Sequence, residues 1–306
     1  MTDTPREYPF LTACRGGEPP YTPVWLMRQA GRYMKHYRDI RAKVSFLELC
    51  KTPDLVAEVT VAPVEALNVD AAILFADILL LLEPMGVGLE YTEGGPEIQR
   101  PVRVRADIDR LRDPIPEESL SYVFEAIRST HAALAGRVPL IGFCGAPFTL
   151  ASYLIEGGAS RNYIHTKRLF HSDPSAWNTL MENLVASTVS YVNAQIAAGI
   201  DALQVFDSWV GCLAPRDYRE YVLPHMRSLM SGVTPGIPII HFGTGTSGLL
   251  ELMREAGSTV LGIDWRIDLD QAWSRVGHDI AIQGNLDPVA LFAPPSEIRR
   301  RVQQVM

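Results

Sequence analysis

Several classes of protein are excluded by what this chain of 306 residues has little of. Its four cysteines lie far apart and form no Cys-x-x-Cys pair, so neither a disulfide framework nor a structural zinc site is indicated. Its net charge is −7, which argues against a non-specific nucleic-acid binder. With 47% hydrophobic and 21% charged residues, the chain has too much apolar content to stay disordered.

Long apolar runs are also missing. The longest covers residues 71–82, but it contains Asp77 and is too short to cross a bilayer. Residues 1–10 contain no apolar stretch of the kind that forms a signal peptide. We therefore expect no membrane association and a cytoplasmic location.

A unit of apolar run, polar or glycine-rich turn and helical pattern recurs along the chain. Short apolar runs of this kind are typical of strands buried on both faces, and their alternation with helices predicts a parallel sheet. The predicted strands are Pro23–Met27, Ala71–Ala76, Val138–Phe143, Ala202–Phe206, Ile237–Phe242, Thr259–Ile263 and Ile280–Gln283. We expect a single α/β domain over residues 1–306, a (β/α)8 (TIM) barrel with seven of its eight strands.

Two helices and one hairpin have clear boundaries. Thr52 is expected to cap a helix that Pro63 kinks, and a long helix is expected to begin at Asp173-Pro174 and end at Gly199. The alternating segment Gly88–Val104 predicts a hairpin that leaves the barrel after its second strand.

A basic segment follows the first predicted strand. Between residues 28 and 43 there are six basic residues and one acid, in an otherwise acidic chain. Arg28 and Arg32 flank Gln29-Ala30-Gly31 just after a strand, where a barrel places its active site. Guanidinium groups bind carboxylates bidentately, so a ligand with several carboxylates is indicated. Three other basic residues of the segment are expected to lie on a solvent-exposed helix face: Lys35, Arg38 and Lys43.

Asp77 stands alone among apolar side chains at the end of the second predicted strand. An ionised carboxylate in such surroundings is costly unless it is hydrogen-bonded. It caps the following helix or serves a ligand. We favour a ligand, because Asp77 is expected on the same rim as Arg28 and Arg32, where it suits a flat molecule with N–H donors at its centre.

Three further polar positions follow predicted strands: Asp207 and Ser208 at a strand end, and Tyr153 one helical turn beyond the segment 142–149. Tyr153 either donates its hydroxyl to a carboxylate or packs its ring, and Ser208 either donates to a ligand or caps the next turn. Asp207 is able to pair with an arginine of the rim. Cys144 is expected to be inert, because no positive residue is near it in sequence.

Residues 243–248 match the Gly-x-Gly-x-x-Gly pattern of dinucleotide-binding loops. Asp264 follows at about the distance expected of a ribose-binding acid. Against a nicotinamide site, four strand–helix units precede this loop, and a tight turn on a barrel rim needs the same glycines. No His-x-His or His-x-Cys spacing occurs, so we expect no catalytic metal.

Five segments, in order along the chain, together resemble the uroporphyrinogen decarboxylase family. They are residues 25–34 (WLMRQAGRYM), 75–79 (FADIL), 142–158 (GFCGAPFTLASYLIEGG), 204–209 (QVFDSW) and 283–288 (QGNLDP). The resemblance implies a cytoplasmic TIM-barrel enzyme, usually a homodimer, that needs no metal or organic cofactor. It implies removal of CO2 from the four acetate groups of the tetrapyrrole uroporphyrinogen III, giving coproporphyrinogen III.

The resemblance also implies roles for particular residues. Asp77 would meet the pyrrole N–H groups and stabilise a cationic intermediate, and Arg28 would act with it as the second catalytic residue. Arginine is a poor acid, so Arg28 is expected to orient a carboxylate rather than to donate the proton. The residues implied to contact the substrate are Arg28, Gln29, Ala30, Gly31, Arg32, Asp77, Tyr153 and Ser208.

In one respect the chain departs from the family. The resemblance implies an Asn-Leu-Gly-His-Gly motif after the last strand, and the sequence ends before it. We therefore expect a truncated chain with weak or no activity, or a fragment that only binds porphyrinogen. A superfamily methyltransferase is a further alternative, but His241-Phe242-Gly243 lacks the cysteine that its zinc site needs.

Overall fold

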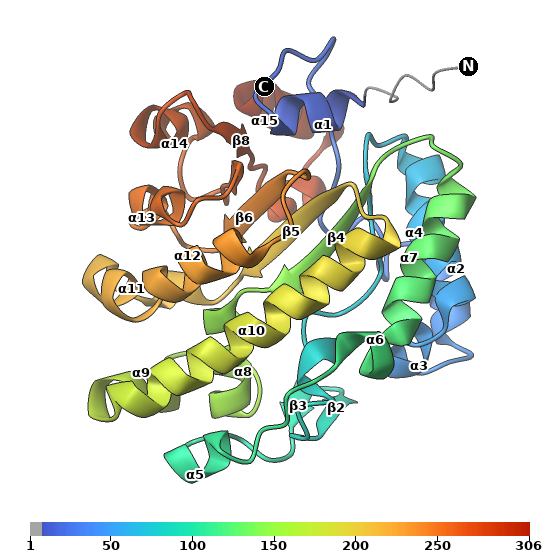
Figure 1. Cartoon of the computed structure of the whole chain (residues 1–306). Helices are drawn as coiled ribbons and strands as arrows, with labels where there is room; N and C mark the ends of the chain where they lie inside the picture. The colour runs from blue at the N-terminus through green and yellow to red at the C-terminus, as the bar shows by residue number, and fades with distance from the viewer. Residues whose placement is uncertain (1–7) are drawn as a thin grey trace.

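The computed structural model describes residues 8–306, and its centre is a sheet of six parallel strands in the order β1-β4-β5-β6-β7-β8 (Figure 1). These strands are β1 (Ala72–Ile73), β4 (Leu140–Gly145), β5 (Ala202–Asp207), β6 (Ile239–Gly243), β7 (Val260–Gly262) and β8 (Ala281–Gln283). Each lies within or beside a run predicted from the sequence. The α/β fold with parallel strands is confirmed, and the sheet is open, because β1 and β8 do not pair with each other.

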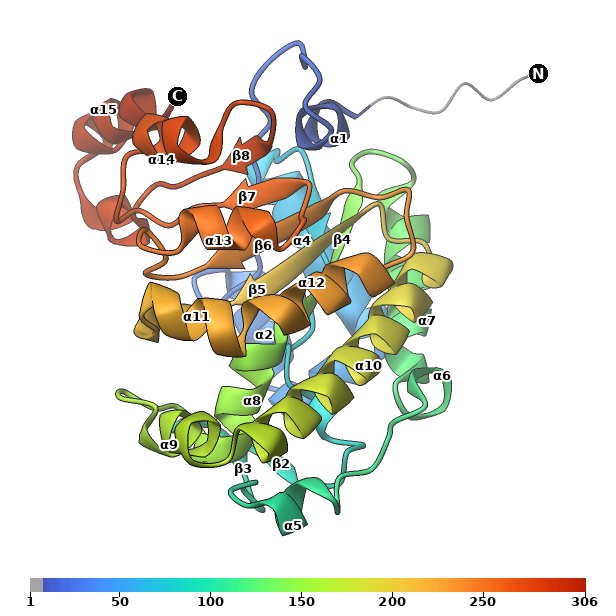
Figure 2. The same ribbon diagram turned by 60° about the vertical axis from the view of Figure 1, so that its left-hand side comes forward.

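Helices surround this sheet, and α4 and α7 lie side by side next to it (Figures 1 and 2). They are α1 (Pro9–Cys14), α2 (Lys35–Arg41), α3 (Phe46–Cys50), α4 (Pro53–Leu67), α5 (Arg105–Ile108), α6 (Pro116–Ser119), α7 (Ser121–Leu134), α8 (Pro147–Glu156), α9 (Ile164–Ser172), α10 (Pro174–Ala198), α11 (Pro215–Tyr221), α12 (Leu223–Gly232), α13 (Leu250–Glu255), α14 (Leu269–Val276) and α15 (Pro295–Val305). Short 3-10 turns are η1 (Leu80–Leu82), η2 (Val210–Cys212) and η3 (Pro288–Phe292). Within residues 8–306, no helix combines the length and the apolar character needed to cross a bilayer.

The two predicted helix boundaries have different outcomes. The long helix α10 follows the prediction, because the Asp173 side chain accepts a hydrogen bond from the Ala176 backbone and Gly199 ends the helix with a left-handed φ of 111°. Thr52 stands at the N-cap position of α4, as predicted, but its side chain makes no capping hydrogen bond. Its hydroxyl donates to the carbonyl of Glu48 at 2.7 Å, in the preceding helix, and so does not cap α4.

Residues 23–27 are not a strand, which corrects the first strand of the prediction. The Asp70 amide donates to the Val24 carbonyl at 2.8 Å, and the Val24 amide donates to the Asp70 carboxylate at 2.7 Å. The indole of Trp25 donates to the side chain of Gln283 in β8 at 2.8 Å. The Val24 amide thus bonds to a side chain instead of to the backbone of a neighbouring strand. The segment contacts both edges of the sheet, near β1 and at β8, without pairing as a strand with either.

The hairpin predicted within residues 88–104 is present. Strands β2 (Leu89–Thr92) and β3 (Gly95–Ile98) pair antiparallel, with Thr92 opposite Gly95. Gly95 has a φ of 113°, which only glycine adopts without strain. Figure 2 shows the hairpin at the α8 end of the molecule, away from α1.

Alternate residues of the strands build two cores. An inner cluster contains Ile141 and Phe143 together with the apolar residues at the start of the other strands, and α1 closes it with Phe10 and Leu11. The outer cluster packs the opposite strand faces against the helices. Because α1 fills the end where the strands begin, the end where they finish is left for loops and functional side chains.

Candidate active site

Asp77 lies just after β1, on the rim where the parallel strands end. One oxygen accepts a hydrogen bond from the Leu79 amide at 2.8 Å, so the carboxylate stabilises the turn before η1. Burial raises the pKa of Asp77 above its ordinary value, and the Leu79 hydrogen bond opposes this rise. One carboxylate oxygen is therefore engaged within its own turn. The second oxygen accepts no hydrogen bond of regular geometry from any described residue.

Arg28 is the positive charge that acts on this carboxylate. Burial raises the pKa of both Asp77 and Tyr153, and the Arg28 guanidinium opposes this rise in each case. The side chain of Arg28 is exposed and forms no ion pair or hydrogen bond within residues 8–306. The two residues predicted to be catalytic thus lie within electrostatic reach of each other without forming an ion pair, and the guanidinium is left open to an anion.

The loop between these arginines is anchored through Gln29. Its side chain is only 1% exposed, and it donates to the Ala71 carbonyl at 3.2 Å while accepting from the Leu26 amide at 3.3 Å. Ala30 and Gly31 stay partly exposed. Gln29 therefore fixes the loop on the edge of β1, and it is the backbone around Ala30 that faces outward.

Arg38 is exposed on α2, as the solvated-face prediction requires, but its guanidinium also binds the loop before that helix. Its guanidinium, on α2, donates to the Arg32 carbonyl at 2.8 Å and to the Tyr33 carbonyl at 2.9 Å. Lys35 is likewise exposed, and it pairs with Asp39 one turn away, as a solvated helix face would. These contacts of Arg38 could not be predicted from the sequence, because its partners are backbone carbonyl groups, which every residue has.

Tyr153 lies in α8, the helix that follows β4, and Ser208 directly follows the neighbouring strand β5. The ring of Tyr153 packs edge-on against Trp209, with 5.7 Å between ring centroids. Burial, with a smaller effect from Asp77, raises the pKa of the Tyr153 hydroxyl, so it stays protonated at neutral pH and is able to donate. Ser208 is partly exposed, and its hydroxyl makes no hydrogen bond to the described residues.

Tyr91 of the hairpin is a site residue that the sequence did not reveal. Its hydroxyl is buried and lies beside Asp77, close enough to lower the pKa of that carboxyl, although no hydrogen bond of regular geometry joins them. The Asp77 charge and burial together raise the pKa of Tyr91, so the phenol stays protonated. The ring of Tyr91 packs on Phe46, with 4.7 Å between the ring centroids. Only the folding of the hairpin over the rim brings Tyr91 to this position.

The suggested pairing of Asp207 with a rim arginine is wrong. Asp207 is fully buried; it accepts a hydrogen bond from Thr149 at 3.1 Å and contacts His241 at 3.4 Å. Cys144 is also buried, and burial raises its pKa, so its thiol is a poor nucleophile at neutral pH.

The glycine loop after β6 is held in place by a hydrogen bond to Asp264. Asp264 is 3% exposed; one carboxylate oxygen accepts from the Gly245 amide at 2.6 Å and also pairs with Arg266. The other accepts from the Arg266 amide at 3.1 Å. A ribose-binding acid needs free oxygens, so the loop is explained by the rim turn rather than by a dinucleotide.

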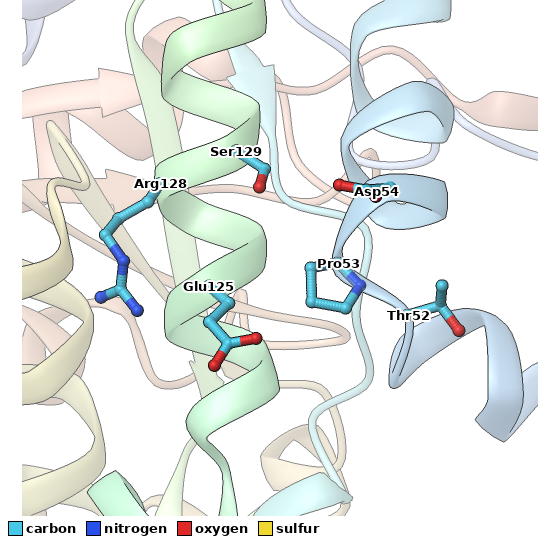
Figure 3. Close-up of a pocket in the computed structure, with 6 residues that line it drawn as sticks. All are labelled: Thr52, Pro53, Asp54, Glu125, Arg128 and Ser129. Atoms are coloured by element: carbon cyan, nitrogen blue, oxygen red, sulfur yellow. The ribbon is translucent and has the colours of Figure 1, made fainter.

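A cavity of about 410 Å³ lies away from the rim, between the outer helices α4 and α7 (Figure 3). Its lining mixes the acids Asp54 and Glu125 with Arg128, and it contains none of the predicted site residues. We therefore place the candidate site at the strand ends. Within residues 8–306, no three histidine, cysteine, aspartate or glutamate side chains form a group suited to a metal ion.

Comparison with known proteins decides the family. The family model described as uroporphyrinogen decarboxylase matches residues 5–306. The chain belongs to the uroporphyrinogen decarboxylase family. It is 57% identical over 308 residues to the uroporphyrinogen decarboxylase of Carboxydothermus hydrogenoformans, a match that covers 100% of this chain and 87% of that protein. The protein of the same name from Sorangium cellulosum is 55% identical, with 97% and 85% covered.

Among solved structures, a methyltransferase from Methanosarcina mazei superposes with a TM-score of 0.80 over 97% of this chain and 88% of that one. At 20% identity this likeness concerns the fold alone. The chain spans 87% and 85% of the length of the two family members compared above, at more than half identity, and these matches do not favour the fragment that only binds porphyrinogen.

Proposed function

We propose that the chain is a carboxy-lyase that converts the four acetate groups of uroporphyrinogen III to methyl groups, giving coproporphyrinogen III. The observation that carries the proposal is Asp77, partly buried just after β1 and acted on by the charge of Arg28, in a member of this family. A macrocycle with N–H donors at its centre and carboxylates at its edge matches one acceptor surrounded by guanidinium groups.

The chemistry requires a negative group under the ring. Protonation of a pyrrole α-carbon gives a delocalised cation, and the bond to the departing CO2 delivers its electrons into that cation. Loss of CO2 leaves an exocyclic methylene group; a second proton adds to this carbon to form the methyl group, and the proton first added to the α-carbon leaves, which restores the aromatic pyrrole. An ionised Asp77 stabilises the cation electrostatically, and preorganised groups of this kind contribute about 3–4 kcal/mol to transition-state stabilisation.

Other residues are assigned to binding and orientation. Arg28 and Arg32 hold substrate carboxylates, while Tyr153 donates to the substrate from α8 and Ser208 donates from the turn after β5. Gln29 supports the loop whose Ala30 and Gly31 line the site. Exposure of both guanidinium groups, without internal partners in residues 8–306, supports their assignment to binding.

The proposal extends to the protein's setting. The family resemblance supports a homodimer in the cytoplasm that works without a metal or organic cofactor. Light scattering of the purified chain tests the dimer, and assay of the chain after treatment with a chelator tests metal independence.

The deciding experiment is an anaerobic incubation with uroporphyrinogen III. Oxidation of the products to porphyrins and their separation by number of carboxylates is expected to show the tetracarboxylate, with Asp77→Asn inactive and the exposed Asp109→Asn unchanged. The proposal would be overturned if the wild-type chain bound uroporphyrinogen III but removed none of its carboxylates.

A further inference from the structure

A buried hydrogen-bond network lies behind the turn that carries Ser208. The backbone amide of Trp209 donates to the hydroxyl oxygen of Thr149 at 3.3 Å, and this hydroxyl donates to Asp207 at 3.1 Å. The second oxygen of Asp207 faces Nε2 of His241 at 3.4 Å. The side chains of Thr149, Asp207 and His241 are all 0% exposed.

The network joins three elements of the rim. Asp207 is the last residue of β5, His241 belongs to β6, and Thr149 lies in the first turn of α8. The same helix carries Tyr153, whose ring packs on Trp209. The position of the Ser208–Trp209 turn is therefore set relative to two neighbouring strands and to Tyr153.

We propose that Thr149, Asp207 and His241 are positioning residues for substrate binding, which hold the Ser208–Trp209 turn in register with Tyr153. The inference rests on the proposed decarboxylase function, for which Ser208 and Tyr153 contact the substrate. None of the three touches the substrate itself, because all are buried behind the rim.

The direction of each hydrogen bond explains why these residue types are used. A carboxylate only accepts, so Asp207 forces both Thr149 and His241 to act as donors toward it. Once the Thr149 hydrogen points at Asp207, the lone pairs of that hydroxyl are left for the Trp209 amide. The Thr149 hydroxyl thus bridges the Asp207 carboxylate and the Trp209 amide, and so fixes the conformation of the turn that follows Asp207.

Replacement of Thr149 by valine tests the inference, because the two side chains have nearly the same shape and only the hydroxyl is lost. Thr188→Val is the matched control, since Thr188 is equally buried and its hydroxyl has no partner in residues 8–306. We expect Thr149→Val to raise the KM for uroporphyrinogen about tenfold with kcat within about threefold, and Thr149→Ser to restore KM.

The outcomes separate this inference from the proposed function. Absence of CO2 release by the wild-type chain refutes the function, whereas an active wild type with equal KM in Thr149→Val and Thr188→Val refutes the network. Where Thr149→Val does not fold, Thr149→Ser and Thr149→Ala repeat the comparison without added bulk. Equal KM values in that pair overturn the inference, and a raised KM in the alanine variant alone supports it.

Discussion

The guanidinium of Arg38 donates to the backbone carbonyl of Arg32 at 2.8 Å, so one arginine of the basic segment positions another. Arg38 lies on α2, whereas Arg32 lies in the loop that precedes it. A second hydrogen bond, to the Tyr33 carbonyl, holds the same loop. The exposed guanidinium of Arg32 is thereby presented from a fixed backbone, which lowers the entropy lost when it binds an anion.

Loss of Arg38 is expected to weaken substrate binding through Arg32. We expect Arg38→Ala to raise KM about fivefold, with little change in kcat, and Lys43→Ala, on the same exposed surface, to have no effect. Steady-state kinetics of the double variant Arg32→Ala/Arg38→Ala checks the mechanism. If Arg38 acts through Arg32, its removal costs little once Arg32 is gone, and full additivity of the two losses contradicts this coupling.

Arg32 itself is expected to bind rather than to react. Arg32→Ala should raise KM by about tenfold or more while kcat falls by less, because a carboxylate remote from the reacting carbon is held equally in the ground state and the transition state. Lys35→Ala is the control, since Lys35 is exposed and paired with Asp39. An unchanged KM in Arg32→Ala counts against the binding role.

Replacement of Asp77 is expected to lower activity while leaving the fold intact. Asp77→Asn should lower kcat by about 100- to 1,000-fold, because the negative charge under the macrocycle is lost. The shape and the hydrogen bond from Leu79 are retained by asparagine, so circular dichroism should show an unchanged fold. Turnover at the wild-type rate would mean that the charge of Asp77 plays no part in the reaction.

The pH dependence of stability checks the same residue independently. Because burial raises the pKa of Asp77 in the folded state, this group favours folding below its unfolded pKa, and that contribution is lost as pH rises through the folded pKa. We expect Asp77→Asn to have a higher Tm than the wild type at pH 7 and an equal Tm below about pH 4. A lower Tm for the variant at pH 7 would show that the ionised carboxylate stabilises the fold.

Tyr91→Phe is expected to move the acid limb of the pH–rate profile. The Tyr91 phenol lowers the pKa of Asp77, so its removal raises that pKa and the rate starts to fall at a higher pH as the solution is acidified. Tyr122→Phe is the matched control, because the Tyr122 hydroxyl is buried without a partner in residues 8–306 and Tyr122 exerts no effect on the pKa of Asp77. Identical profiles for Tyr91→Phe and Tyr122→Phe argue against a role for Tyr91.

The glycine loop is expected to bind no dinucleotide. Both carboxylate oxygens of Asp264 are engaged by the loop and by Arg266, which leaves no acceptor for a ribose. A fluorescence titration with NADH should therefore show no saturable change. Saturable binding that Asp264→Asn abolishes would revive the nicotinamide hypothesis.

The sequence by itself determined the order of the elements and most of the rim. Buried parallel strands have continuous apolar runs, so all six observed strands were predicted, together with the hairpin and the cap at Asp173. Arg28 and Asp77 were predicted as site residues from charged side chains that follow apolar runs, and their catalytic roles remain a prediction. Local patterns suffice where the cause of a structure lies within a few residues.

Only the tertiary structure decided which groups meet. The segment 23–27 has the composition of a strand, but Asp70 and Gln283 satisfy its polar groups in place of a ladder. Tyr91 reaches Asp77 from a hairpin, and His241 reaches Asp207 from another strand. Contacts between residues far apart in sequence depend on packing of the whole chain, because side-chain hydrogen bonds and desolvation are set by neighbours that no local pattern specifies.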